Sequence, residues 1–226
     1  MSATGARLLA GASGFSFPTW RPGFYPAGAR NADFLRLYAE RLPTVEVNNS
    51  FYRLPAASVF ERWAQTVPDG FRFAVKAPRA VSVFGRVDYV PDLNARVRSL
   101  GDRLGPLLVR FADGKQRDDE FLARLLDAID TGLDVALDFR DPSWDGIEPE
   151  LERWGAVRVN QLDATAARFR YLRLREPPYD DAALETWAQR IGAFLDDGID
   201  VYCYFRHEDE PTAPAYAARL LALVNG

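Results

Sequence analysis

The chain alternates between two kinds of segment, and this alternation constrains the fold more than any other feature of the sequence. Short apolar runs of strand length alternate with segments whose apolar residues recur at helical spacing. The expected strands are residues 8–13, 44–49, 71–77, 106–111, 134–140, 156–162, 169–175 and 200–206. The expected helices are residues 33–42, 56–65, 92–104, 118–130, 181–197 and 214–224, with a short, irregular one at 147–154. Such alternation predicts parallel strands joined by crossover connections.

Charges on these strands help to choose between two parallel folds. In residues 171–175 and 135–140 one face is apolar, whereas the other face ends in charged residues. An open, doubly wound sheet buries both faces and favours near-continuous apolar runs. The pattern therefore favours a (β/α)8 TIM-type barrel with irregular fifth and sixth helical connections, and the link at 163–169 holds no convincing helix. We expect residues 1–226 to form a single (β/α)8-like barrel domain, because such barrels often have this length.

Composition narrows the classes of function. Cys203 is the only cysteine and His207 the only histidine, so an intrachain disulfide and a cysteine zinc cluster are excluded, and a Ser-His pair or two-histidine metal site nearly so. The net charge of -4 argues weakly against a general nucleic-acid binder, although not against a local basic cleft. No apolar run approaches the roughly 20 residues that cross a bilayer. The chain start lacks the apolar core of a signal peptide, so we expect a cytoplasmic protein with no membrane partner.

Charged residues cluster where a barrel places its active site, at the carboxyl ends of the strands. Six cations and two anions are expected to face inward there, and a cleft of one sign attracts the opposite charge. These residues are Glu46, Lys76, Arg110, Asp138, Arg140, Arg173, Arg175 and Arg206. Because the planar arginine fork matches phosphate and carboxylate, we expect a small anionic ligand. The competing interpretation is a salt-bridge network that joins Glu46 to Lys76, and Asp138 to Arg140 or Arg110.

Four of these residues form the expected catalytic set: Glu46, Lys76, Asp138 and Arg140. Glu46 is the candidate general base, with Asn48 beside it on the same face. Lys76 could be a nucleophilic amine, but ion pairing or anion binding is the favoured role. Magnesium held by Glu46 and Asp138 is disfavoured by the surrounding cations, so no metal is expected. The sequence identifies no cofactor.

Aromatic residues cluster in the loops that follow the first, second and fifth expected strands. Trp20 and Tyr52 could stack on a base or sugar, whereas a hydrophobic lid over the barrel mouth explains most of the other rings. Cys203 is expected to be a buried thiol and His207 a surface residue. The expected ligand-binding residues are Trp20, Asn48, Tyr52, Arg110, Trp144, Asn160, Arg173, Arg175 and Arg206.

Several motifs resemble the YecE-like family, also called domain-of-unknown-function family 72. They occur in the family's order over nearly the whole chain and include GASGFSFPTW (11–20), VEVNNSFYRLP (45–55), FRFAVKAPRA (71–80), LDFRDPSW (137–144) and YLRLR (171–175). The resemblance implies an (α/β)8-type barrel but supplies no reaction.

The chain also departs from the pattern of that family. Asp138 stands where the family usually has glutamate, and Val83 and Arg175 stand where histidines are common. The segment RHED (206–209) replaces a usual Asn-Asn-Asp. These changes add positive charge and put in doubt any mechanism that needs a histidine proton shuttle.

Three functions remain open at this point. The first is an enzyme, such as a cofactor-independent hydrolase, lyase or isomerase, that acts on a small anionic substrate, with a nucleotide-like compound among the candidates. The second is a non-catalytic nucleic-acid-binding protein that uses the arginine-rich mouth and the loop aromatics. The third is a barrel whose charged mouth is structural or meets a protein partner. The sequence does not predict an oligomeric state.

Overall fold

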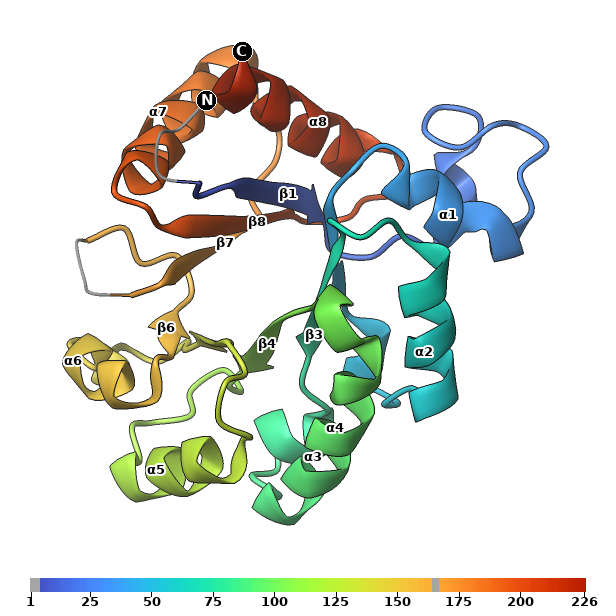
Figure 1. Ribbon diagram of the computed structural model, residues 1–226. Helices are drawn as coiled ribbons and strands as arrows, with labels where there is room; N and C mark the ends of the chain where they lie inside the picture. The colour runs from blue at the N-terminus through green and yellow to red at the C-terminus, as the bar shows by residue number, and fades with distance from the viewer. Residues whose placement is uncertain (1–4, 164–166) are drawn as a thin grey trace. The chain divides into compact units, whose positions relative to one another are not determined.

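The computed structural model describes residues 5–163 and 167–226, which contain eight parallel strands alternating with helices (Figure 1). The strands follow the order β6-β5-β4-β3-β2-β1-β8-β7. They are β1 (Leu8–Ala12), β2 (Thr44–Val47), β3 (Arg72–Lys76), β4 (Leu104–Arg110), β5 (Val135–Asp138), β6 (Val157–Arg158), β7 (Phe169–Leu174) and β8 (Asp200–Phe205). This arrangement is a (β/α)8 TIM-type barrel, so the expected fold class is confirmed.

The α-helices follow the strands along the chain, and all of them except α3 overlap segments that the sequence predicted as helical. They are α1 (Phe34–Ala39), α2 (Ala57–Thr66), α3 (Arg79–Ser82), α4 (Val90–Val97), α5 (Asp119–Ala128), α6 (Glu148–Leu151), α7 (Asp181–Asp196) and α8 (Thr212–Asn225). The short 3-10 helices are η1 (Pro18–Trp20), η2 (Asn31–Asp33), η3 (Asn49–Phe51), η4 (Val87–Tyr89), η5 (Arg98–Arg103), η6 (Pro142–Trp144) and η7 (Glu152–Trp154).

Two helical connections differ from the expectation. Helix α3 was not predicted, because four residues are too few to show a helical period. The expected helix at 92–104 ends as α4 at Val97 and continues as 3-10 helix, which Gly101 interrupts at φ 54°. The fifth connection is irregular as expected, because α6 passes directly into η7. In the sixth connection no described residue is helical, and residues 164–166 of the expected non-helical link lie outside the described residues.

The chain divides into two compact units. We call Met1–Glu46, Thr66–Arg72 and Arg168–Gly226 the terminal unit, and Val47–Gln65 and Phe73–Ala167 the middle unit. The expectation of a single domain stays a prediction.

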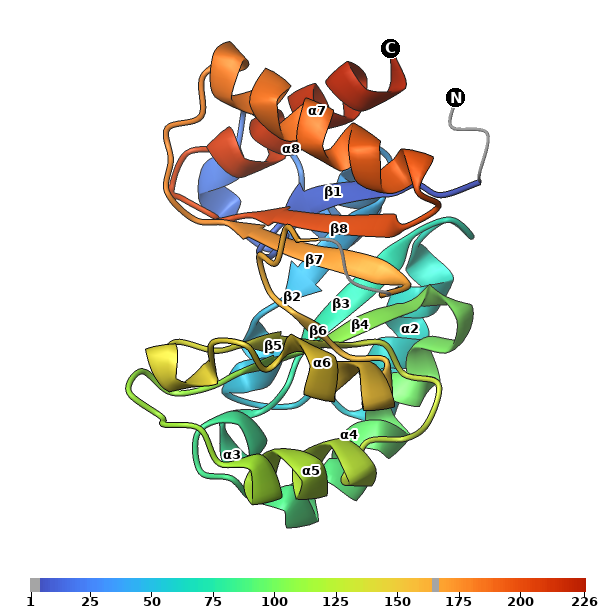
Figure 2. The ribbon, with the colours of Figure 1, turned by 90° about the vertical axis from the view of Figure 1, so that its left-hand side faces the viewer.

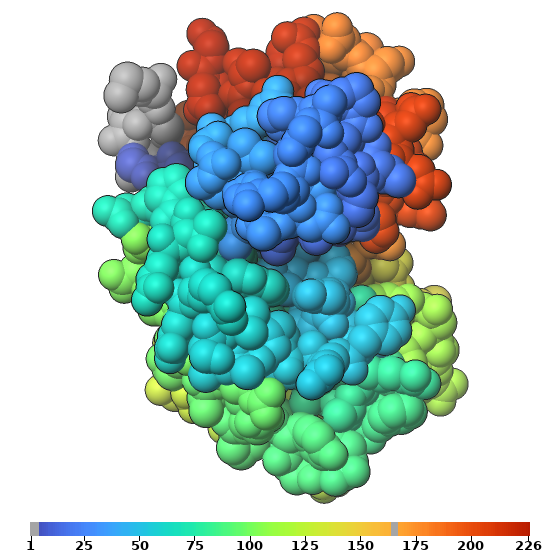
Figure 3. Space-filling view, turned by 90° about the vertical axis from the view of Figure 1, so that its right-hand side faces the viewer, coloured from blue at the N-terminus to red at the C-terminus, as the bar shows by residue number. Residues whose placement is uncertain are grey.

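In the terminal unit, β1 lies between β2 and β8, and β7 pairs with β8. Figures 1 and 2 show α7 and α8 packed together against these strands, in orange and red. Helix α7 begins where the Asp180 carboxylate accepts a hydrogen bond from Ala183 N at 2.8 Å, a typical N-cap. The segment after β1, blue in Figure 3, forms a compact mass of side chains in which Tyr25 stacks on Phe34 at 4.2 Å between ring centroids.

In the middle unit, β4 lies between β3 and β5, and β6 pairs with β5. Helix α5 begins at a similar cap, because Asp118 accepts a hydrogen bond from Phe121 N at 2.9 Å. The core of this unit includes Phe111, Phe139 and Trp144, and the last two rings stack 4.3 Å apart. Figure 1 shows α3, α4 and α5, in green, on the outer side of these strands.

The contact between β1 and β2 requires glycine at position 11. A Cβ atom on Gly11 would lie 2.0 Å from the backbone oxygen of Thr44. Beside it, the Tyr38 hydroxyl accepts a hydrogen bond from Ala12 N at 2.8 Å and donates one to Thr44 O at 2.9 Å. The two strands are therefore fixed at a separation that leaves no room for a side chain.

Gly11→Ala should therefore destabilise the protein strongly. Because the clash is with the backbone of Thr44, it cannot relax by a rotamer change, and we expect a loss of about 3 kcal/mol or more in the free energy of unfolding. Urea unfolding measures this loss. Gly28→Ala is the control, because a Cβ at Gly28 meets no atom within 4 Å. Equal unfolding midpoints for the two variants would contradict the prediction.

Candidate functional site

A fully buried carboxylate lies in the terminal unit. Glu46 on β2 has 0% of its surface exposed. The Tyr171 hydroxyl donates a hydrogen bond to its Oε2 at 2.9 Å, and Nη2 of Arg173 donates to its Oε1 at 2.9 Å. Both donors come from β7. A buried ion pair is stable only when both groups have good partners, and these two bonds provide such partners for the carboxylate.

Alternation along β7 explains this geometry. Tyr171 and Arg173 are two positions apart and share a face of the strand. Arg170 has the opposite parity, and its guanidinium lies 5.0 Å from the ring centroid of Phe194 on α7. Parity along the strand predicted that Arg173 faces inward, but Tyr171 was not predicted as a partner of Glu46. The signal was present, because Tyr171 shares parity with Arg173, but a pattern of charges alone does not reveal a hydroxyl donor.

Burial keeps Tyr171 protonated. Desolvation, followed by the negative charge of Glu46, raises the pKa of the Tyr171 hydroxyl well above its usual value. Tyr171 is therefore a permanent donor to Glu46 at neutral pH. Its ring lies 5.2 Å from that of Tyr204, whose hydroxyl is hydrogen bonded to Thr44 Oγ1 at 2.7 Å.

Two arginines and the histidine follow the neighbouring strands. Arg175 comes directly after β7 and Arg206 directly after β8, and the paired strand ends place them together, with Arg206 N donating to Leu174 O at 2.9 Å. The His207 ring stacks on Phe17 with 4.7 Å between ring centroids. Partial desolvation and then the charge of Arg175 lower the pKa of His207, with a smaller contribution from Arg206.

The charge of Glu46 acts on His207 in the opposite direction, because it favours the imidazolium. These residues therefore influence one another electrostatically. We call them the Glu46 cluster: Glu46, Tyr171, Arg173, Arg175, Arg206 and His207. His207 is exposed, as the sequence predicted, but its place in the chain gave no indication of these charged neighbours.

An ion pair ends β5 in the middle unit. Nη2 of Arg140 donates to Oδ2 of Asp138 at 3.0 Å, and its Nε lies 3.0 Å from Oδ1, which is the two-pronged geometry of a strong pair. Arg110 lies opposite Asp138 in the strand register, but its Nη2 contacts Asp113 at 2.7 Å. The pairing of Asp138 with Arg140 matches the salt-bridge interpretation of the sequence.

Lys76 ends β3 in the same unit. Its Nζ lies 4.1 Å from the ring centroid of Phe51, a contact that stabilises an ammonium ion. Ser50 Oγ donates to Lys76 O at 2.7 Å and to Val47 O at 2.9 Å, which fixes the loop that holds Asn48. The aromatic contact supports a cationic role for Lys76 over that of a nucleophilic amine.

The remaining predicted ligand-binding residues differ in exposure. Trp20 and Trp144 are fully buried, and their indole N–H groups donate to Glu208 O at 3.0 Å and Lys115 O at 2.8 Å. Such rings offer no face to a ligand, and we propose no ligand contact for them. Tyr52, by contrast, is 83% exposed. Asn160 is exposed after β6 and has a left-handed backbone with φ 62°.

Within residues 5–163 and 167–226, no three His, Cys, Asp or Glu side chains come together as metal ligands would. None of the described helices combines the length and the apolar character needed to span a bilayer.

Comparison with known proteins identifies the family. The model of a family described as "Protein of unknown function DUF72" matches residues 9–226. The chain therefore belongs to the DUF72 family, the same family as the YecE-like one suggested by the sequence motifs. No curated protein matches the chain.

Solved structures of the same family share the fold. A DUF72 family protein from Thermotoga maritima MSB8 is similar with a TM-score of 0.81 at 21% identity, over 97% of this chain and 99% of that one. Another from Enterococcus faecalis V583 gives 0.78 at 16% identity, over 97% and 96% of the two chains. At these identities the likeness shows the fold alone.

Glu46→Gln should destabilise the terminal unit. The substitution keeps the shape of the side chain but removes the negative charge that faces the buried Arg173 guanidinium. We expect a loss of about 3 kcal/mol in the free energy of unfolding, measured with urea. The control is Glu40→Gln, because Glu40 forms an exposed pair with Arg36 and its loss should cost less than about 1 kcal/mol. A wild-type midpoint for Glu46→Gln would show that the charge of Glu46 is unimportant.

Proposed function

We propose that this protein is an enzyme that acts on a small anionic substrate, bearing phosphate or carboxylate, at the carboxyl ends of its strands. The observation that carries the proposal is the Glu46 cluster, in which a fixed, buried carboxylate is paired with Arg173, and two further arginines act on a histidine whose pKa is lowered. Perturbed ionisable groups that gather at strand ends are typical of barrel active sites.

Arg175 and Arg206 are the proposed anion-binding residues. The three arginines and one glutamate of the cluster give it a charge of +2 with His207 neutral, in a chain of net charge -4. Arg206 is exposed and forms no ion pair with any acid in the described ranges. A guanidinium in this position can bind a phosphate or carboxylate through two parallel hydrogen bonds.

His207 is the proposed proton acceptor. Its lowered pKa keeps the imidazole neutral at neutral pH, so that it can take a proton from a bound substrate. The charge of Glu46 then favours the imidazolium that forms. Glu46 itself is fully buried and held by two donors, and we therefore propose it as a positioning residue rather than the direct base.

The middle unit supplies further candidates for anion binding. Arg140 is held by Asp138, and Lys76 is kept cationic by Phe51. Arg110 lies on the strand beside Asp138. Their involvement in the same reaction stays a prediction.

Anion binding should depend on Arg206. Inorganic phosphate, sugar phosphates and small carboxylates are screened at low salt by thermal shift, because binding to the folded state raises Tm. We expect one class to raise Tm of the wild type, and we expect Arg206→Ala to abolish the shift. Arg36→Ala, which removes an exposed arginine already paired with Glu40, should retain the shift. The absence of a shift with every anion would refute the proposal.

His207 can report anion binding directly, because it is the only histidine. Its imidazole signal in a proton NMR titration should give a pKa below 6.5 in the free protein. A bound anion offsets the nearby arginine charges and favours the imidazolium, so saturating phosphate should raise this pKa. Arg175→Ala should raise it without phosphate, whereas Arg36→Ala should not. An unchanged pKa on addition of a ligand that raises Tm would place that ligand elsewhere.

A further inference from the structure

A pocket of about 620 Å³ lies in the middle unit, lined by the loop after β2 and the segments from the end of β3 into α4. This volume is within the range of small-molecule sites. Figure 3 shows both groups of segments, from cyan to green, on one face. The residues that matter here are Tyr52, Arg53, Arg79, Phe84, Arg86 and Tyr89.

Exposed aromatic rings gather at this pocket. Among the described residues, four large hydrophobic side chains are exposed, and three of them line it: Tyr52 at 83%, Phe84 at 62% and Tyr89 at 45%. The fourth is Leu162. Single exposed apolar residues are ordinary, but a cluster of them in a concave site marks a binding surface.

The walls of the pocket are held in place by hydrogen bonds. The backbone N–H groups of Phe84 and Arg86 donate to Arg79 O at 3.2 Å and Ala80 O at 2.9 Å. Nη1 of Arg96 donates to Leu54 O at 3.3 Å and so joins α4 to the loop after β2. Phe84 is therefore exposed by an ordered backbone, and a ligand would find the site already formed.

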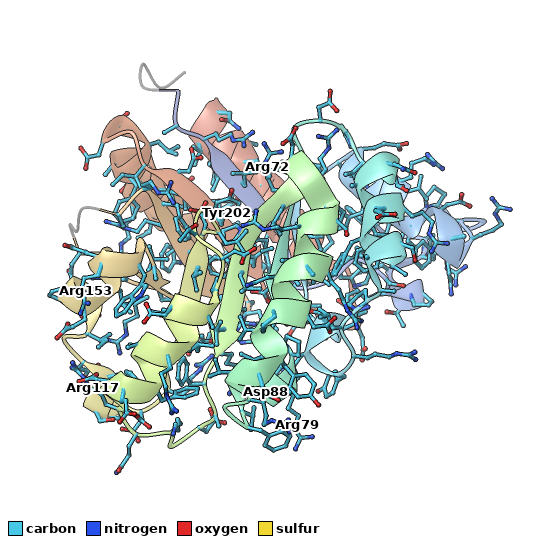
Figure 4. The ribbon with its side chains drawn as sticks, turned by 60° about the horizontal axis from the view of Figure 1, so that its bottom comes forward. Arg72, Arg79, Asp88, Arg117, Arg153 and Tyr202 are labelled. Atoms are coloured by element: carbon cyan, nitrogen blue, oxygen red, sulfur yellow. The ribbon has the colours of Figure 1, made fainter. Side chains whose placement is uncertain are left out.

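Positive charge remains after the local acids are paired. Asp88 contacts Arg86 at 2.6 Å and Asp92 contacts Arg96 at 2.8 Å. Arg53 and Arg79 also line the pocket, and neither forms an ion pair with an acid in the described part of the chain. The Arg79 guanidinium lies 4.9 Å from the centroid of the Phe84 ring. Figure 4 shows Arg79 and Asp88 at the same end of the unit.

We propose that this pocket binds a nucleoside phosphate, either as a free nucleotide or as part of a single nucleic-acid strand. The base would stack on the exposed rings of Phe84 and Tyr52, and the phosphate would pair with Arg53 and Arg79. A ligand in which a flat ring is joined to an anionic group matches this site, because exposed aromatic rings lie beside arginines that are not paired with acids. The site uses other residues than the Glu46 cluster, and it stands whether or not the proposed reaction does.

Two binding measurements at low salt test this proposal. One is fluorescence anisotropy with a fluorescein-labelled oligothymidylate, and the other is calorimetric titration of thymidine monophosphate. Phe84→Ala should weaken binding about 5- to 150-fold, which is the loss expected when one base–aromatic stack is removed. Arg79→Ala should weaken it and reduce its dependence on salt. Arg190→Ala is the matched control, because the Arg190 guanidinium also lies over an aromatic ring, that of Trp187, but outside the pocket.

Each outcome has a defined meaning. Tight binding of the strand with weak binding of the monophosphate identifies nucleic acid as the source of the ligand, and comparable affinities identify the free nucleotide; both support the site. The proposal is overturned if neither probe binds, if Phe84→Ala binds as the wild type does, or if ribose 5-phosphate or polyglutamate binds equally well. Arg206→Ala should leave this binding unchanged, which separates it from the proposed enzymatic site.

Discussion

The buried carboxylate of Glu46 is the constraint on which the terminal unit depends. Removing an ionised carboxylate from water costs several kcal/mol, and only fixed donors can offset that cost. Tyr171 and Arg173 provide such donors from β7, and this sets which face of β7 points at β2. The same face and register then determine where Arg175 and Arg206 emerge at the strand ends. Structural stability and the chemistry of the candidate site therefore share one interaction.

The fold could be predicted because its signal is local. Strand length, helical spacing and parity are properties of short segments, and all eight expected strands are present. The partners of the site were harder to predict, because Glu46 and Tyr171 lie 125 positions apart in the chain. Hydroxyl groups gave no charge signal, so Tyr171 was not predicted, and His207 was expected only as the surface residue that it is. Loop tryptophans also gave no indication of whether their N–H groups would meet a ligand or a backbone carbonyl, as Trp20 and Trp144 do.

Counting charges at strand ends overstates the free positive charge. The count of six cations and two anions omitted acids in the adjacent loops, and Asp113 is one of them, paired with Arg110. Asp138 binds Arg140 through both of its oxygens. Arginines in this protein therefore serve several purposes, from packing on Phe194 to holding a buried carboxylate. Whether an arginine is available to a ligand depends on its exposure and on whether a nearby acid already pairs with it. The number of cations at the strand ends does not decide this.

The two fully buried tryptophans have a consequence for how the chain unfolds. Trp20 belongs to the terminal unit and Trp144 to the middle unit, and each indole is fixed by a backbone carbonyl within its own unit. Their fluorescence therefore reports on separate parts of the polypeptide. If the barrel unfolds as one cooperative domain, both indoles meet water at the same denaturant concentration. Two separate transitions would mark the units as independent folding elements.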